Sequence, residues 1–198
     1  MYDSNHTSVL LDDQTKSQRT KILSRLHGLD FNLIPMNGKK PCVEWKPYQT
    51  RRVTAAEIKE WMRGRFPTKD GNNLWRATLL NFALLTGAAP WSDDNPGIVV
   101  IDPDDEEADE MVRRHCPPTP MLQWTGSGHL HRVYRRPNVE DVPYIANRQK
   151  TWIDGRQYNL DLRGDGGYIM APGSSVDEVK PENMKAMVDF TREYGKYS

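Results

Sequence analysis

The 198-residue sequence has little cysteine and no long apolar run. Cys42 and Cys116 are its only cysteines, and because they form no CxxC pair they give no indication of a disulfide framework. No apolar run approaches the roughly 18–20 residues needed to span a bilayer, and the N-terminus lacks the apolar core of a signal peptide. We therefore expect a cytoplasmic protein without a membrane partner.

The chain also lacks an excess of charge of either sign, since it has 27 basic and 27 acidic residues. Net charge therefore gives no indication of a nucleic-acid partner. The distribution is uneven, however: residues 102–110 are strongly acidic, whereas residues 131–163 carry seven Lys and Arg side chains. Such segregation suits a metal site beside a phosphate-binding surface, but it equally suits two solvated faces of opposite sign.

Hydrophobic periodicity and turn signals predict one α+β domain. Helices are expected over 15–27, from a Thr54–Glu57 capping box onward, over about 105–115, and from Pro181 to about Gly195. Strands are expected over 31–35, 81–86 and 97–102, with hairpins over 121–136 and 157–171 and a loop over 67–78. We expect residues 1–14 to be a flexible N-terminal end and 15–198 to form a single domain.

The strand signal at 97–102 (GIVVID) is the strongest in the sequence, and it ends in Asp102-Pro-Asp104. Side chains two residues apart on a strand share a face, so both carboxylates project together. That arrangement is costly unless a cation lies between them, although the two acids could also be solvated caps of the next helix. An EF-hand loop is excluded because its sixth position requires Gly and Glu107 stands there.

A second polar constellation lies in Tyr158-Asn-Leu-Asp-Leu-Arg163, where Asp161 and Arg163 share a face with Asn159. Taken alone, this pattern is also typical of a solvent-facing strand.

The third constellation, Thr125-Gly-Ser-Gly-His-Leu-His131, is a donor-rich loop of the kind that can hold phosphate oxygens. His129 and His131 share a strand face and could bind metal or anions. Zinc is not expected, because the only further candidate pair, His115-Cys116, does not complete a recognisable ligand spacing.

Together and in this order, these segments resemble the N-terminal catalytic domain of bifunctional DNA primase/polymerases, within the archaeo-eukaryotic primase superfamily. The resemblance covers about residues 25–175. It rests on Gly28–Pro35, Lys39-Lys-Pro41 with Trp45, Asn81–Gly87, Gly97–Asp104, Pro117–Pro120, Thr125–His131 and Leu160–Pro172. The last three blocks in that order are the most specific.

The resemblance implies a primase-type α+β fold with an RRM-like sheet and flanking helices. It implies that Asp102, Asp104, Asp161 and His131 are catalytic and that the three aspartates hold two divalent ions, Mg²⁺ or Mn²⁺. It further implies nucleotide contacts from His131, from Ser127 and Gly128 on a phosphate loop, and from Arg163 and Lys39. His129 stands where the family commonly has a second glycine, so it either alters this loop or adds a ligand.

The implied activity is template-dependent nucleotidyl transfer in DNA replication, with making or extension of primers. Its partners would be a single-stranded DNA template, a primer and NTPs or dNTPs, and a helicase or C-terminal primase module can follow such a domain. Basic and aromatic residues would hold the template strand, for which the candidates are Trp124, Arg132 and Trp152.

Other functions are also compatible with parts of the pattern. His129-Leu-His131 fits the His–hydrophobic–His metal motif of rolling-circle replication nucleases, but no Tyr has the Lys four residues later that such enzymes commonly carry. A catalytically silent nucleotide- or nucleic-acid-binding module would keep the same loop without turnover. A DxD glycosyltransferase would leave the histidine loop unexplained.

Overall fold

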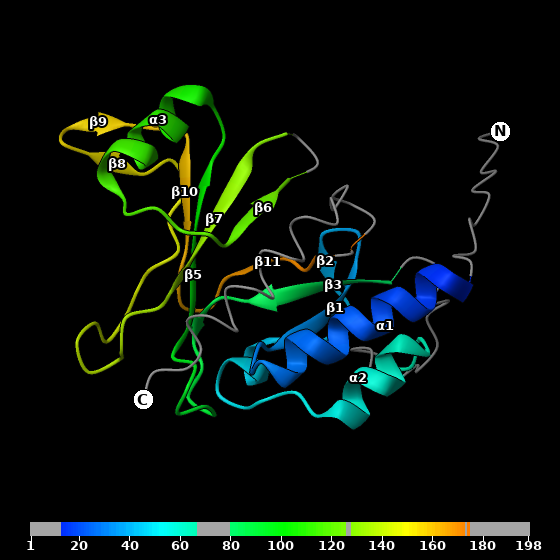
Figure 1. Ribbon diagram of the computed structural model, residues 1–198. Helices are drawn as coiled ribbons and strands as arrows, with labels where there is room; N and C mark the ends of the chain where they lie inside the picture. The colour runs from blue at the N-terminus through cyan, green and yellow to red at the C-terminus, as the bar shows by residue number, and fades with distance from the viewer. Residues whose placement is uncertain (1–12, 67–79, 126–127, 173, 175–198) are drawn as a thin grey trace, which may run out of the picture.

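The computed structural model describes residues 13–66, 80–125, 128–172 and 174, which form the predicted α+β arrangement of helices and antiparallel strands (Figure 1). The helices are α1 (Asp13–Gly28), α2 (Ala55–Met62) and α3 (Glu106–His115), with a short 3-10 helix η1 (Lys46–Gln49). No helix of this described part has the length and apolar character needed to cross a membrane. The predicted helix from Pro181, the loop 67–78 and most of the N-terminal end 1–14 lie outside the described residues.

The first sheet has the strand order β11-β3-β1-β2, with every neighbouring pair antiparallel. Its strands are β1 (Leu33–Asn37), β2 (Lys40–Pro41), β3 (Leu80–Leu85) and β11 (Tyr168–Met170). Helices α1 and α2 pack on this sheet, and their apolar side chains, including Leu23 and Trp61, form the main core with those of β1 and β3 (Figure 1). The packing of these apolar side chains holds the first sheet against α1 and α2.

Strand β1 begins two residues after its predicted start at Phe31, because the turn that follows α1 extends to Phe31. Asp30 has the left-handed φ of 65°, and the amide of Phe31 still donates to the carbonyl of Leu26 at 3.1 Å. The chain leaves this helix-terminating turn only after Phe31 is buried.

The start of α2 confirms the predicted capping box. Thr54 Oγ1 accepts from the amide of Glu57 at 3.1 Å, and the amide of Thr54 donates to Glu57 Oε2 at 2.8 Å. Ile58 and Trp61 are buried as predicted, and Met62 is partly buried. The Glu57 carboxylate also accepts from both terminal nitrogens of Arg51.

This network predicts a pH-dependent contribution of Glu57 to stability. Hydrogen bonds from Arg51, opposed by burial and aided by those from Thr54 and Tyr48, lower the pKa of Glu57 from 4.5 to about 2. A lowered folded-state pKa stabilises the fold above pH 4.5, and the contribution is lost as the pH falls toward 2. Glu57→Gln is expected to lower the free energy of unfolding by about 1 kcal/mol near neutral pH.

Urea unfolding at several pH values checks this expectation, with the exposed Glu44→Gln as control. The gap between wild type and Glu57→Gln should close as the pH falls through this range. A gap that is constant with pH would contradict it.

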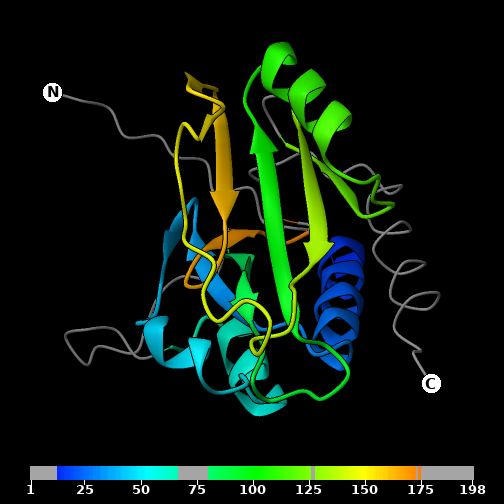
Figure 2. The same ribbon diagram turned by 90° about the vertical axis from the view of Figure 1, so that its left-hand side faces the viewer.

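The second sheet has the strand order β10-β5-β7-β6, again antiparallel throughout. Its strands are β5 (Gly97–Pro103), β6 (Leu122–Trp124), β7 (Leu130–Arg135) and β10 (Leu160–Arg163), and a short β4 (Gly87–Ala88) pairs with β5. Helix α3 connects β5 to β6 while β7 lies between them, which is the split β-α-β order of the predicted RRM-like sheet (Figure 2). The β6–β7 hairpin is therefore confirmed.

Strand β5 is covered on both faces, as its continuous apolar sequence predicts. On one face Val100 belongs to the main core, and on the other Ile101 packs against the cluster that α3 forms with Leu160. Between β7 and β10 the chain adds a small two-stranded sheet, β8 (Trp152–Ile153) and β9 (Arg156–Gln157).

The predicted hairpin over 157–171 is wrong. Strand β10 pairs with β5 in the second sheet, whereas β11 pairs with β3 in the first, and the two run in different directions (Figure 2). The turn between them is held by Asp165, whose carboxylate accepts from Arg136 Nε at 3.0 Å and from the amides of Ala88 and Ile145, each at 2.7 Å. These contacts direct the chain from one sheet to the other.

A glycine makes this crossing possible. Gly87 has a left-handed φ of 100°, and a Cβ placed on it would lie 2.5 Å from Cα of Asp165. The chain from β3 into β4 and the chain from β10 into β11 therefore pass in direct contact, and a larger residue would separate them.

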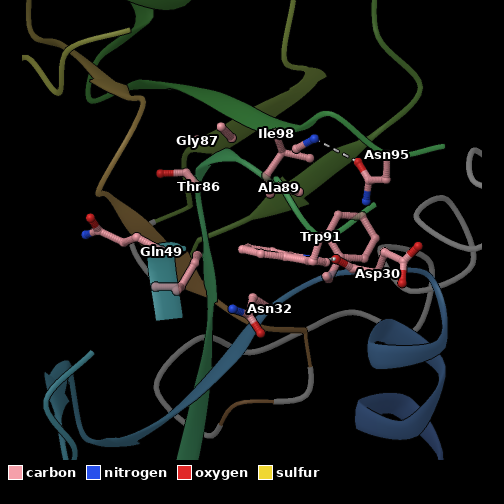
Figure 3. Close-up of a pocket in the computed structure, with 13 residues that line it drawn as sticks. Asp30, Asn32, Gln49, Thr86, Gly87, Ala89, Trp91, Asn95 and Ile98 are labelled. Atoms are coloured by element: carbon pink, nitrogen blue, oxygen red, sulfur yellow. Dashed lines mark hydrogen bonds between the residues drawn. The ribbon is translucent and has the colours of Figure 1, made fainter. Parts of the chain in front are cut away.

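A small pocket lies beside this crossing, between the start of β1 and the segment that leads into β5 (Figure 3). Its volume is about 10 Å³, no more than a single water occupies. Trp91 and Asn95 seal it by donating to the carbonyls of Asp30 and Leu29, each at 3.1 Å. We therefore regard it as part of the packing between the sheets.

Candidate active site

The pairing of β10 with β5 places two of the predicted acids directly opposite each other. Asp161 is the register partner of Asp102, so both carboxylates project from the same face of the second sheet. On the other side of β5, His131 of β7 brings its Nε2 to within 3.2 Å of Asp102 Oδ1. The register of the sheet therefore places Asp161, Asp102 and His131 side by side in one row across three strands. These residues lie up to 59 positions apart in the sequence.

Asp102 is stabilised as an anion by its neighbours. Burial alone would raise its pKa, but the hydrogen bond and charge of His131, followed by the charges of Arg163 and His129, hold the pKa below its ordinary value. The group therefore stays negative in a partly buried position.

Asp161 is only 8% exposed, so the solvent-facing alternative for this strand is wrong. Its Oδ2 accepts from Arg163 Nη2 at 2.7 Å, and its Oδ1 accepts from the amide of Lys150 at 3.2 Å. Leu160, one residue earlier, packs on the opposite face against α3. The predicted division of this strand into an apolar and a polar face is confirmed.

Asp104 follows directly after β5, where its amide donates to the carbonyl of Asn159 at 2.8 Å. Burial, and then the negative charges of Asp102 and Asp161, raise the pKa of Asp104 above its ordinary value. The three carboxylates are thus close enough to repel one another, and a bound cation would relieve that repulsion.

The donor set suits a hard divalent cation, because three carboxylates supply the oxygen ligands that Mg²⁺ and Mn²⁺ prefer. In the described part of the chain, however, no three His, Cys, Asp or Glu side chains are arranged so that they could hold a metal ion. Asp102 faces His131 and Asp161 faces Arg163 instead. The three carboxylates are therefore suitable ligands for a divalent metal. The side chains of Asp102 and Asp161 would have to rotate away from His131 and Arg163 to bind it.

These groups, except Asp161, line a cleft of about 510 Å³ between the two sheets. The second sheet contributes Asp102, Asp104, His131 and Arg163, and the first contributes Tyr168 and Met170 from β11. Lys39, from the turn between β1 and β2, also lines the cleft, as expected for a phosphate or template contact.

Seven lining residues were not predicted as site residues: Thr125, Asn147, Gly166, Gly167, Tyr168, Ile169 and Met170. Thr125 and Tyr168 lie within the segments that carry the family resemblance, which is the signal that could have found them. Asn147 had no such signal, because it lies in an irregular segment. It reaches the cleft by binding the β10–β11 turn, where its Oδ1 accepts from the amide of Gly164 at 3.0 Å.

The loop between β6 and β7 is described only in part. Ser127 lies outside the described residues, whereas Gly128 is exposed and has a left-handed φ of 86°. The amide of His129 donates to Thr125 Oγ1 at 3.1 Å, and the charge of His129 contributes to the lowered pKa of Asp102 and opposes the larger effects that raise the pKa of Asp104. His129 therefore lies beside the acids, on the same side as His131.

The proposed template residues divide into two groups. Trp124 and Trp152 are exposed, as a base-stacking role requires. Arg132 is buried and forms an ion pair with Asp109 of α3, so the interpretation of this residue as a template contact is wrong. The alternation along β7 places Arg132 on the face opposite to His131.

The acidic residues of 102–110 do not form one continuous negative surface, because several of them are paired with basic side chains. The acids of α3 form ion pairs on its surface, Glu106 with Arg113, Glu107 with Arg156, Asp109 with Arg113 and Arg132, and Glu110 with Arg114. Asp102 and Asp104, which line the cleft, are the acids of this run that face the site.

The fold and the cleft define a class of α+β domain with an RRM-like sheet and acids at the end of its central strand. Residues 24–188 match the family described as bifunctional DNA primase/polymerase, N-terminal. This match spans most of the chain, and the protein belongs to that family. A search of curated proteins found no match.

Proposed function

We propose that this protein catalyses template-dependent nucleotidyl transfer, making or extending primers on single-stranded DNA from NTPs or dNTPs. The observation that carries the proposal is the row of Asp161, Asp102 and His131 across three neighbouring strands, with Asp104 and Arg163 beside it, in a member of the primase/polymerase family. The family match also favours this function over the rolling-circle nuclease and the glycosyltransferase.

In this proposal Asp102, Asp104 and Asp161 hold divalent Mg²⁺ or Mn²⁺. When bound, two such ions would stabilise the attacking and leaving oxygens as a primer 3′-hydroxyl displaces pyrophosphate from the α-phosphorus. His131 and Arg163 from the second sheet and Lys39 from the first supply positive or donor groups for the triphosphate in this cleft.

Other groups would hold the substrates in place. The loop at Gly128 is exposed, and its amide, which donates to the carbonyl of Thr125 at 3.0 Å, would have to exchange that partner to donate to a phosphate oxygen. Trp124 and Trp152 are exposed aromatic surfaces on which bases of the template strand could stack. A helicase or primase module acting after this domain is a further partner that we infer from the family alone.

The direct test is incubation of the protein with a single-stranded template, Mg²⁺ or Mn²⁺, and labelled NTPs or dNTPs, with and without a primer. Templated incorporation is the expected result, and its dependence on the primer separates extension from initiation. Absence of incorporation under all of these conditions would contradict the proposal.

A second function has one observation in its favour. Because Asp102 faces His131 and Asp161 faces Arg163, the described side chains form ion pairs rather than a metal-binding cluster. A nucleotide-binding module without turnover would keep these pairs. Binding of nucleotide without metal, together with no incorporation, would support it.

We expect His131→Ala to weaken nucleotide binding roughly 10- to 100-fold, because a charge-assisted hydrogen bond to a phosphate would be lost. Isothermal titration calorimetry with a dNTP measures the affinity. His115→Ala, at the exposed end of α3, is the control and should bind as wild type does. Equal affinity of His131→Ala and wild type would remove His131 from the site.

A further inference from the structure

Gln123 on β6 and His131 on β7 are neighbours that each bury a polar atom without a partner. They are register partners in the second sheet, and only 1% of Gln123 and 8% of His131 is exposed. Within the described part of the chain, neither Gln123 Oε1 nor His131 Nδ1 has a hydrogen-bond partner. Buried polar atoms are normally paired, so these two require an explanation.

The other ends of both side chains are already fixed. Gln123 Nε2 donates to the carbonyl of Met170 at 2.9 Å, which ties β6 to β11 of the first sheet. His131 Nε2 faces Asp102 Oδ1 at 3.2 Å. The free atoms are therefore an amide oxygen, which can only accept, and a ring nitrogen, which can donate.

Directly opposed residues of an antiparallel pair have Cβ atoms about 4.5–5.5 Å apart, within reach of a glutamine and a histidine side chain. We propose that Gln123 is a positioning residue for His131: a rotation of the two side chains, which are unpaired at these atoms, lets His131 Nδ1–H donate to Gln123 Oε1. This bond satisfies both unpaired atoms, places a hydrogen on Nδ1 in addition to the one that Nε2 donates to Asp102, and holds the ring with Nε2 directed toward Asp102. The effect on substrate rests on the proposed function, in which His131 contacts the nucleotide.

Gln123→Met tests the pairing, because methionine fills a similar volume but accepts no comparable hydrogen bond. The substitution also removes the tie to Met170, so it needs a matched control. Thr86→Val provides this control. Thr86 is buried directly after β3, and its Oγ1 donates to the carbonyl of Gly164, directly after β10, at 2.7 Å. This bond also joins the two sheets but does not involve His131.

A double-mutant cycle with His131→Ala measures whether Gln123 acts through His131. We expect Gln123→Met to weaken dNTP binding in calorimetry roughly five- to tenfold. In the His131→Ala background it should cause no further change, and Thr86→Val should leave the affinity unchanged while lowering stability. A loss of equal size in both backgrounds would overturn the proposal.

Nitrogen-15 NMR of histidine-labelled full-length protein tests the pairing without nucleotide. His131 Nδ1 should carry a hydrogen in wild type, and its resonance should move in Gln123→Met but not in Thr86→Val. An unchanged His131 resonance in a folded Gln123→Met protein would overturn the proposal. Failure of wild type to bind nucleotide would count against the proposed function alone, since the NMR result still decides the pairing.

Discussion

Asp102→Asn is expected to lower the rate of primer extension at least about a thousandfold, a loss at the upper end of those found when one electrostatic contact to the transition state is removed. Asparagine keeps the shape of the side chain but removes the negative charge at the centre of the row that Asp161 and His131 complete. The fold should persist, because the substitution also removes one of the charges that raise the pKa of Asp104.

Asp105→Asn is the matched control for this experiment. Asp105 lies three residues away and caps α3 through the amide of Ala108 at 2.8 Å, a function that asparagine performs equally well. It should retain extension, and urea unfolding should show both variants folded. Extension retained by a purified Asp102→Asn/Asp161→Asn double variant would contradict the assignment of these acids.

Asp165→Ala is expected to lower the free energy of unfolding by about 3–5 kcal/mol, because it leaves a buried guanidinium without its counter-ion. The side chain of Arg136 is fully buried, and it donates to Asp165 through Nε at 3.0 Å and Nη2 at 2.9 Å. The same carboxylate holds the β10–β11 turn against Ala88 and Ile145. Urea unfolding measures the loss.

The stabilisation of the fold by the Arg136–Asp165 pair should decrease at low pH. Burial would raise the pKa of Asp165, but hydrogen bonds from Arg136 and from the amides of Ile145 and Ala88 hold it below its ordinary value of 3.8. The stabilisation is therefore present above that value and is lost as the pH falls below it.

Asp141→Ala, at an exposed acid of the neighbouring segment, is the control and should unfold as wild type does. Arg136→Met/Asp165→Leu should recover part of the loss, because it leaves no unpaired charge. If Asp165→Ala unfolded within about 0.5 kcal/mol of wild type, as surface substitutions do, the turn would not depend on this pair.

The elements that could be predicted from sequence are those whose signals are local. The Thr54–Glu57 capping box and the continuous apolar run of β5 are complete within a few residues, and both are confirmed. The hairpin over 157–171 was predicted from its glycine turn alone, which is also a local signal. The prediction was wrong because contacts from distant residues decide the path of the chain after that turn. Its real course is decided by Arg136 and Ala88, whose contacts with Asp165 cannot be inferred from spacing.

The candidate site shows the same division. The DxD pattern and the alternation around Asp161 indicate which side chains share a face, but only the register of β10 on β5 brings Asp161 opposite Asp102. Gln123 gave no sequence signal, since its importance depends on its neighbour across β6 and β7. Arg132 was misassigned because composition alone does not show which face of a strand a basic residue occupies.

Binding of Mn²⁺ decides whether Asp102, Asp104 and Asp161 hold divalent metal, as we propose. Electron paramagnetic resonance measures free Mn²⁺ as protein is added in the presence of a dNTP, which allows comparison of wild type, Asp105→Asn and Asp102→Asn/Asp161→Asn. We predict that wild type and Asp105→Asn bind Mn²⁺ alike, while the double variant leaves the free signal as it is with nucleotide alone. Equal Mn²⁺ binding by the double variant and wild type would contradict the claim.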